Sequence, residues 1–223
     1  MTLLEAIKER HSVRSYLPKA MEGNLKQLIQ KEIDHCNQKS GLHIQLVTNE
    51  PKAFDNFLAH YGKFQGVQNY IALIGKKGSD LEEKSGYYGE HLALFAQTLG
   101  LNTCWVAMTF RKKFTKSQCQ IVANEKLVCV LALGYGTTNG VPHTSKQLDA
   151  VCTNAATAPE WFKQGVEMAL LAPTAMNQQN FLFSLHGTSV SAKSTGGFYS
   201  KVDLGIVKYH FELGVDGTPF TWG

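Results

Sequence analysis

An arginine-serine-arginine segment near the N-terminus is the first group of residues whose types and spacing could do chemistry. Arg10, Ser12 and Arg14 alternate with His11 and Val13, so in an extended segment their side chains project to one side. Arginine presents a planar fork of donors that matches phosphate oxygens, and a serine hydroxyl can donate a further hydrogen bond. The spacing therefore favours a phosphate site, although so short a pattern alone is more often a solvated basic turn.

A second group of polar residues lies far along the chain, between Ala172 and Gln179. Pro173 ends the preceding helical pattern, and Thr174 can bond locally. Three carboxamide residues then share one turn before an apolar strand: Asn177, Gln178 and Gln179. Carboxamides both donate and accept, so they can match a ligand edge on which carbonyl and N–H groups alternate. Alone, such a turn is more typical of a polar loop.

Hydrophobic periodicity predicts the elements that position both segments. The stretch from Thr2 to Glu9 has helical spacing and a capping-box pattern, so a short helix should deliver Arg10 to Arg14 at its end. Further helices are predicted over 24–37, 53–61, 85–99, 115–122, 160–171 and 202–213. Strands or extended segments are predicted over 42–47, 69–74, 103–108, 127–133 and 181–185.

The order of these elements repeats. Helix 160–171, turn and strand 181–185 follow the pattern of helix 25–37, turn and strand 42–47. The buried helix over 202–213 matches the one around Gly89 at an offset of 116 residues (205 − 89), although polar His91 and Gln97 stand where the later helix is apolar. Two copies cannot form a solenoid, which needs about three units. We predict one domain, 1–223, built of two repeats (about 1–156 and 157–223) that form a pseudo-dimer.

Three further segments connect these two groups to a known family. They are Gly100-Leu101-Asn102-Thr103-Cys104-Trp105, Leu131-Ala132-Leu133-Gly134-Tyr135-Gly136 and Lys146-Gln147-Leu148-Asp149-Ala150-Val151. With the two polar segments they resemble the series R-x-S-x-R, A-P-S-x-x-N-x-Q-P, G-L-G-S-C-W, a strand ending in G-Y, and a basic residue before L-E-x-V of the nitroreductase family. The resemblance covers nearly the whole chain. Thr174 replaces the family's serine and keeps its hydroxyl, and Asn180 replaces a proline.

The resemblance implies an α+β nitroreductase-like fold, a mainly antiparallel sheet flanked by helices, with flavin mononucleotide (FMN) at the junction of the repeats. The family's amide turn follows its first long helix, where this chain has Lys39-Ser40-Gly41, so the second repeat is expected to supply the turn. The implied cofactor-binding residues are Arg10, His11, Ser12, Arg14, Pro173, Thr174, Asn177, Gln178, Ala107, Met108 and Lys146. Backbone at Ala107 and Met108 would lie near flavin N5 and stabilise the charge that develops as hydride arrives.

The implied activity is that of an NAD(P)H-dependent FMN oxidoreductase. NADH or NADPH would deliver hydride to FMN and leave, and a small electron acceptor such as a nitroaromatic or quinone would take its place. No side chain is expected to act as an acid, and no catalytic side chain is assigned. Two alternatives stay open: dehalogenation or flavin breakdown on the same fold, and a flavin-binding or sensing protein without turnover. The substrate pocket is expected from loops 64–68 and 191–199.

Composition disfavours several other classes. The chain has 223 residues, 43% of them hydrophobic, and a net charge of +4, and its one dense basic run, Arg111-Lys112-Lys113, has no aromatic ladder typical of nucleic-acid binding. The five cysteines show no C-x-x-C pair and the eight histidines no metal spacing, so reduced thiols and no metal are predicted. No apolar run approaches the roughly 18 residues of a membrane span.

These observations lead us to expect a cytoplasmic protein without nucleic-acid or membrane partners. The second repeat lacks an R-x-S-x-R segment between Val151 and Glu160, so one FMN per chain is predicted. A monomer or weak homodimer is expected, because a second subunit is not required to complete the site.

Overall fold

The computed structural model describes residues 1–215 and 217–223. Its larger sheet is antiparallel, with strands in the order β1 (Gln45–Val47), β2 (Asn69–Lys76), β4 (Glu125–Gly134) and β3 (Asn102–Val106). A smaller sheet contains β5 (Phe181–His186), β6 (Ser189–Ser194) and β7 (Thr221–Trp222). The helices are α1 (Leu3–Glu9), α2 (Leu25–Ser40), α3 (Phe57–Tyr61), α4 (Leu81–Thr98), α5 (Lys112–Ser117), α6 (Glu160–Leu170) and α7 (Ser200–Gly214), with 3-10 turns η1 (Pro51–Phe54), η2 (Leu148–Ala150) and η3 (Ala175–Asn177).

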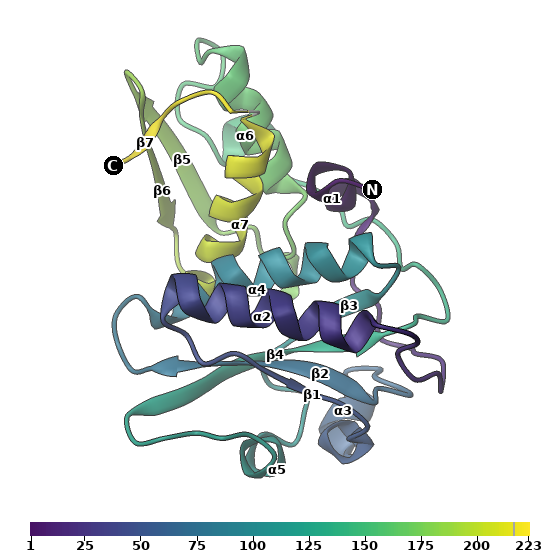
Figure 1. The fold of residues 1–223 in the computed structure, drawn as a ribbon. Coiled ribbons are helices and arrows are strands. Elements are labelled where there is room, and N and C mark those ends of the chain that lie inside the picture. The colour runs from purple at the N-terminus through teal and green to yellow at the C-terminus, as the bar shows by residue number, and fades with distance from the viewer. Residues whose placement is uncertain (216) are drawn as a thin grey trace.

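The larger sheet is covered on both faces because its central strands β2 and β4 are apolar and buried over most of their length. Alternate residues of β2 belong to two separate hydrophobic clusters. Ile71 and Leu73 pack with residues of α2 and α4, while Tyr70 and Ile74 pack with residues around η1 and β3. Figure 1 shows α2 and α4 on one side of this sheet and α3 and α5 on the other. Helices α6 and α7 and the smaller sheet lie beyond α4.

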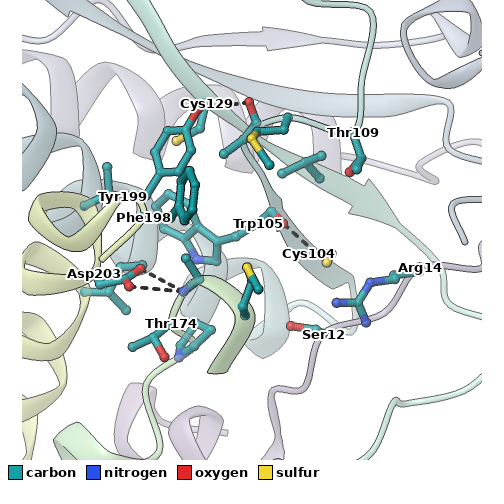
Figure 2. Close-up of a pocket in the computed structure, with 18 residues that line it drawn as sticks. Ser12, Arg14, Cys104, Trp105, Thr109, Cys129, Thr174, Phe198, Tyr199 and Asp203 are labelled. Carbon is teal, nitrogen blue, oxygen red and sulfur yellow. Dashed lines mark hydrogen bonds between the residues drawn. The ribbon is translucent and has the colours of Figure 1, made fainter. Parts of the chain in front are cut away.

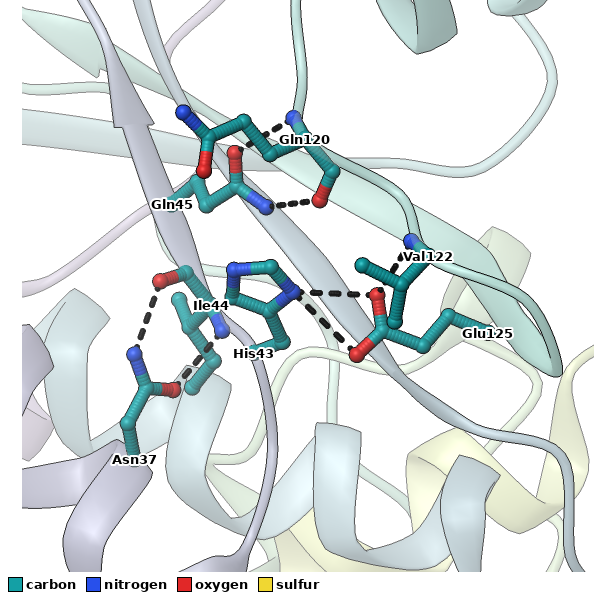
Figure 3. Close-up of polar contacts among 7 residues, drawn as sticks. All are labelled: Asn37, His43, Ile44, Gln45, Gln120, Val122 and Glu125. Carbon is teal, nitrogen blue, oxygen red and sulfur yellow. Dashed lines mark hydrogen bonds and ion pairs between the residues drawn. The ribbon is translucent and has the colours of Figure 1, made fainter.

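The edge strand β1 is shorter than the predicted strand over 42–47, and side chains hold the segment around it (Figure 3). The Asn37 amide both donates to and accepts from the backbone of Ile44, at 2.9 and 2.7 Å. Gln45 bonds the backbone of Gln120 in the same two-way manner, at 2.7 and 2.9 Å. Side-chain contacts thus hold this edge to α2 and to the segment before β4.

Helices α4 and α7 join the two halves of the chain through two glycines. A Cβ on Gly86 would collide with the carbonyl of Val202, and a Cβ on Gly205 with the carbonyl of Glu83. The two contacts are equivalent to each other. Gly86 corresponds to Gly205 and Glu83 to Val202, with the same separation of 119 residues in both cases (205 − 86 and 202 − 83). The hydrogen bonds His91–Tyr209 and Glu90–His210 are equivalent in the same way, because His91 corresponds to His210 and Glu90 to Tyr209 (210 − 91 and 209 − 90). Such reciprocal contacts are typical of two-fold interfaces. Equivalent positions of α4 and α7 are therefore 119 residues apart in the structure, rather than the 116 residues that the sequence match suggests.

Several predicted elements need correction. The helix predicted over 53–61 is η1 followed by α3, because the Asn56 side chain caps the Ala59 N–H and starts a new helix. The helix predicted over 115–122 is wrong in position, since α5 ends at Ser117. Residues 191–194 belong to β6 rather than to a loop, and β7 was not predicted. The α1 capping box, β2, β4, α6 and α7 are confirmed within a few residues. Within the described residues, no helix has the length and apolarity needed to cross a membrane.

Candidate cofactor site

Two adjoining cavities lie between the two halves of the chain. The first, of about 240 Å³, is here called the apolar cavity, and its walls include Trp105, Ala107, Met108, Phe198, Tyr199 and Asp203. The second, of about 290 Å³, is called the basic cavity, and its walls include Arg10, Val141, Pro142, His143 and Asn177. Both are lined by Ser12, Arg14, Pro173, Thr174 and Met176, so they form one continuous space with two kinds of surface.

The arginine-serine-arginine segment is positioned by the edge of the larger sheet. After α1 the chain runs beside β3, where Ser12 bridges Thr103 and the Val13 N–H donates to the Thr103 carbonyl at 3.1 Å. This extended conformation brings all three polar side chains to the basic cavity, as the alternation predicts. Ser12 and Arg14 also reach the apolar cavity. Among the described residues, Arg14 has no ion-pair partner.

Arg10 is buried beside a carboxylate but is not fully paired. Its Nε lies 3.4 Å from Glu90 Oε1, a contact without hydrogen-bond geometry, and Nε and Nη1 have no hydrogen-bond partner among the described residues. Glu90 itself accepts from Trp105 Nε1 at 2.7 Å. A buried guanidinium with free donors at a cavity wall is suited to receive an anion.

The number of protons held by the buried residues Arg10, Glu90 and His210 also favours a bound anion. His210 Nδ1 lies 3.0 Å from the Met168 carbonyl, which can only accept, so Nδ1 carries a proton. The 3.0 Å contact between His210 Nε2 and Glu90 Oε1 needs a second proton, on either the imidazole or the carboxyl group. In both cases the His210–Glu90 pair is neutral overall. The charge of Arg10 is then unbalanced at a site where isolated charge is costly.

The turn between α6 and β5 forms the opposite wall, and its own amides hold it together. Asn177 donates to the Thr144 carbonyl at 2.9 Å, and Gln179 donates to the same carbonyl at 2.8 Å and to Asn177 Oδ1 at 2.9 Å. Met176, Asn177 and Gln179 have positive φ values of 53°, 54° and 46°. Left-handed backbone at non-glycine residues costs about 1–3 kcal/mol each and collects at functional sites. This strain, together with the cavity, marks the turn as a ligand-facing element.

Asp203 on α7 fixes this turn from behind. Its carboxylate accepts from the Ala175 N–H at 3.0 and 3.1 Å and from Gln178 Nε2 at 2.7 Å. Burial raises the pKa of Asp203 to about 6, although the bonds from Gln178 and Ala175 oppose the rise. Figure 2 shows Asp203 bonded to the turn on one side of the cavity, with Ser12 and Arg14 on the other. Sequence reasoning missed Asp203, because nothing local distinguishes it from a solvated helix residue.

Aromatic and sulfur-containing side chains form the rest of the apolar cavity. Phe198, Tyr199 and Trp105 all line it (Figure 2), and the Tyr199 hydroxyl donates to the Ala107 carbonyl at 3.4 Å. Cys104 and Trp105 line the cavity as well. The rim is apolar and open, since Met108, Phe198 and Met176 are 60%, 65% and 87% exposed. A flat apolar ligand fits this surface, as ligand pockets are mostly apolar with a few polar groups.

Three predicted site residues are not brought to either cavity. The Gln178 amide is taken by Asp203 and by the Phe198 carbonyl at 2.6 Å, so it supports the turn. Lys146 Nζ donates to the Gln179 carbonyl at 3.0 Å and lies 3.4 Å from Asn180 Oδ1. His11 packs beside Gly140 instead. The predicted pocket loop 64–68 lines a separate cavity with Pro51 and His60, whereas Phe198 and Tyr199 from 191–199 do reach the site.

A second polar cluster lies between α2, α4 and α7. Ligand-type atoms of Glu32, Cys36 and His91 lie within 4.8 Å of one another, which sequence spacing did not reveal. His91 Nε2 contacts Glu32 at 2.6 Å and its Nδ1 contacts the Tyr209 hydroxyl at 2.6 Å. Both ring nitrogens of His91 are therefore partnered, and the cluster acts as a tie between helices.

A family model and one solved structure each match nearly the whole chain. A family model described as "Putative TM nitroreductase" matches residues 2–215. A solved structure of a "putative nitroreductase" from Thermotoga maritima is similar over 96% of this chain and 83% of its own, with 24% identity and a TM-score of 0.69. No match was found among curated proteins.

Two further similar structures are of nitroreductases described with FMN. One is a "putative nitroreductase in complex with fmn" from Desulfovibrio desulfuricans, which is 15% identical, covers 68% of this chain and 95% of its own, and has a TM-score of 0.53. The other is a mutant of an "FMN and NADPH-dependent nitroreductase" from Sphingopyxis sp. strain HMH, also 15% identical with a TM-score of 0.53, covering 68% and 97%. At these identities the likeness shows a common fold.

Proposed function

This chain belongs to the family described as "Putative TM nitroreductase", and on that premise we propose that it is an FMN-dependent oxidoreductase that takes hydride from NAD(P)H. The electrons would pass to a small acceptor such as a nitroaromatic or quinone. One observation carries the proposal: the unbalanced Arg10 guanidinium opens onto a basic cavity that continues into an aromatic-walled one.

The residues present fit the two chemical parts of FMN. A phosphate group would balance the charge of Arg10 and take further donors from Ser12 and Arg14, all at the basic cavity. The planar ring system would occupy the apolar cavity, beside Trp105 and Tyr199. Backbone at Ala107, Met108, Pro173 and Thr174 would line the ring on two sides.

The protein's own contribution is binding, orientation and exclusion of water. When bound, FMN supplies the hydride chemistry, so the chain needs no acid or nucleophile. Asp203 and Thr174 hold the strained turn, the latter by accepting from the Gln179 N–H at 3.0 Å. The open apolar rim of Met108, Met176 and Phe198 offers a contact surface for a flat substrate.

We also propose that the site is completed within one chain. Arg10 to Arg14 come from the first part and the Pro173–Asn177 turn from the second, and the reciprocal α4–α7 contacts support a fused pair of repeats. The shares of this chain that are matched are consistent with this, since the Thermotoga structure matches 96% of it while the two structures described with FMN match 68% each. A homodimer would then be optional.

Spectroscopy of the purified protein tests the proposed function. We expect FMN titration to give a bound flavin with a shifted visible spectrum, and anaerobic mixing with NADH or NADPH to bleach it. Absence of FMN binding would refute the cofactor site. Binding without bleaching by either donor would favour the alternative of a flavin-binding protein without turnover.

A further inference from the structure

A basic groove opens beside the apolar cavity. This groove, of about 640 Å³, is lined by Arg111, Lys112 and Lys113 together with apolar Leu58 and Phe114. Met108 belongs to both the groove and the apolar cavity, so the two spaces meet at this exposed side chain. A molecule with its reacting end in the apolar cavity could therefore extend into the groove.

The positive charges of the groove have no compensating acids. No carboxylate is among its lining residues, and within residues 1–215 and 217–223 these three cations form no ion pair. The Arg111 guanidinium lies 5.2 Å over the Phe114 ring, an arrangement that leaves its edge donors free. Unpaired cations that line one groove are suited to a phosphate group.

Lys112 is the partly buried member of the three cations, whereas Arg111 and Lys113 are exposed. Burial, together with neighbouring Lys116, lowers the pKa of Lys112. A bound anion would offset this effect by favouring the charged amine.

From the shared wall and the unpaired cations, we infer that this groove binds the adenosine 2′-phosphate of NADPH and makes NADPH the preferred hydride donor. The inference rests on the proposed function, because it assigns the far end of the same donor. Leu58 and Phe114 supply the apolar surface that an adenine ring needs. NADH lacks the 2′-phosphate and would gain less from the three cations.

Calorimetry with adenosine 2′,5′-bisphosphate tests the groove without relying on any redox step. On the protein saturated with FMN, we expect this probe to bind about tenfold or more tightly than adenosine 5′-monophosphate, a difference that weakens with added salt. The double variant Lys112→Met/Lys113→Met keeps the aliphatic stems and should remove the difference. Lys116→Met is the matched control, because Lys116 lies on the same helix but does not line the groove.

Stopped-flow reduction of the bound flavin gives the second arm. The dissociation constant for NADPH should rise about tenfold in the double variant, while that for NADH changes less than about twofold. Equal losses for both donors would overturn the inference in favour of a diphosphate site, and equal affinity of the wild type for both probes would also overturn it. Reduction by NADH without any preference for NADPH would refute this inference and leave the proposed function standing. Failure of both donors to reduce the flavin would refute the proposed function. The calorimetry would still show whether the groove binds a 2′-phosphate.

Discussion

At the scale of single residues, the buried Glu90 of α4 connects three other parts of the chain. It accepts from Trp105 and contacts His210 and Arg10, so one carboxylate meets residues of β3, α7 and the N-terminal segment. Glu90 and His210 are fully buried and Arg10 is 3% exposed. Removing one member of such a network leaves the others uncompensated. The loss of stability is far larger than if the whole network were replaced by well-packed apolar residues.

Glu90→Ala is expected to lower the free energy of unfolding by about 3–5 kcal/mol, because Trp105 Nε1 and His210 Nε2 lose their partner and Arg10 loses the carboxyl group beside it. Urea unfolding of the protein without cofactor measures this change. Glu82→Ala is the control on the same helix, since Glu82 pairs with Lys126 near the surface and should cost less than about 1 kcal/mol. Similar small losses in both variants would show that the buried network contributes little.

Asp203 gives a pH dependence with a definite sign. Its pKa is raised to about 6 in the folded state, so the folded protein binds a proton more readily than the unfolded chain does. That contribution to stability is complete below the ordinary aspartate pKa and is lost as pH rises through about 6. The unfolding free energy of the wild type, relative to Asp203→Asn, should therefore fall by roughly 2–3 kcal/mol between about pH 4 and 7.5. A difference independent of pH would contradict the assignment.

At the scale of elements, the pairing of α4 with α7 depends on Gly86 and Gly205. Replacing a helical glycine with alanine ordinarily stabilises a helix by about 1 kcal/mol. Here a methyl group at Gly86 would meet the backbone of Val202, which no rotamer change can relieve.

Gly86→Ala is therefore expected to destabilise the protein by about 1–3 kcal/mol despite its better helix propensity. Thermal or urea unfolding would measure it. Lys201→Ala, an exposed position on α7, should change stability by less than about 0.5 kcal/mol. A more stable Gly86→Ala protein would mean that the two helices are not packed this closely.

The elements also show which structural features a single sequence can indicate. Strand β2 and helix α6 were predictable, because their apolar residues follow one period over many positions. Strand β6 was not, since Ser189 to Ser194 is mostly polar and only Val190 is buried. The break between η1 and α3 was missed because the Asn56 cap interrupts an otherwise helical pattern.

At the scale of the whole molecule, residues far apart in sequence meet because α4 and α7 bring the two parts of the chain together. The sequence predicted the Arg10–Arg14 segment, the Pro173–Asn177 turn and the Ala107–Met108 backbone as one site, and all three line the two joined cavities, although His11 of the first segment does not. It could not reveal that Lys146 and Gln178 are used by the turn itself, or that Asp203 supports it. Those roles depend on packing across the chain, which periodicity and spacing do not record.

The central claim is that one chain holds one FMN between these two segments. Calorimetric titration of FMN into protein shown to be monomeric by light scattering tests it most directly, with Arg14→Ala and Asn177→Ala alongside. We predict one FMN per monomer, and binding weakened about tenfold or more when the charge of Arg14 is removed. No binding by the monomer, or one FMN per two chains appearing only in a dimer, would contradict the account.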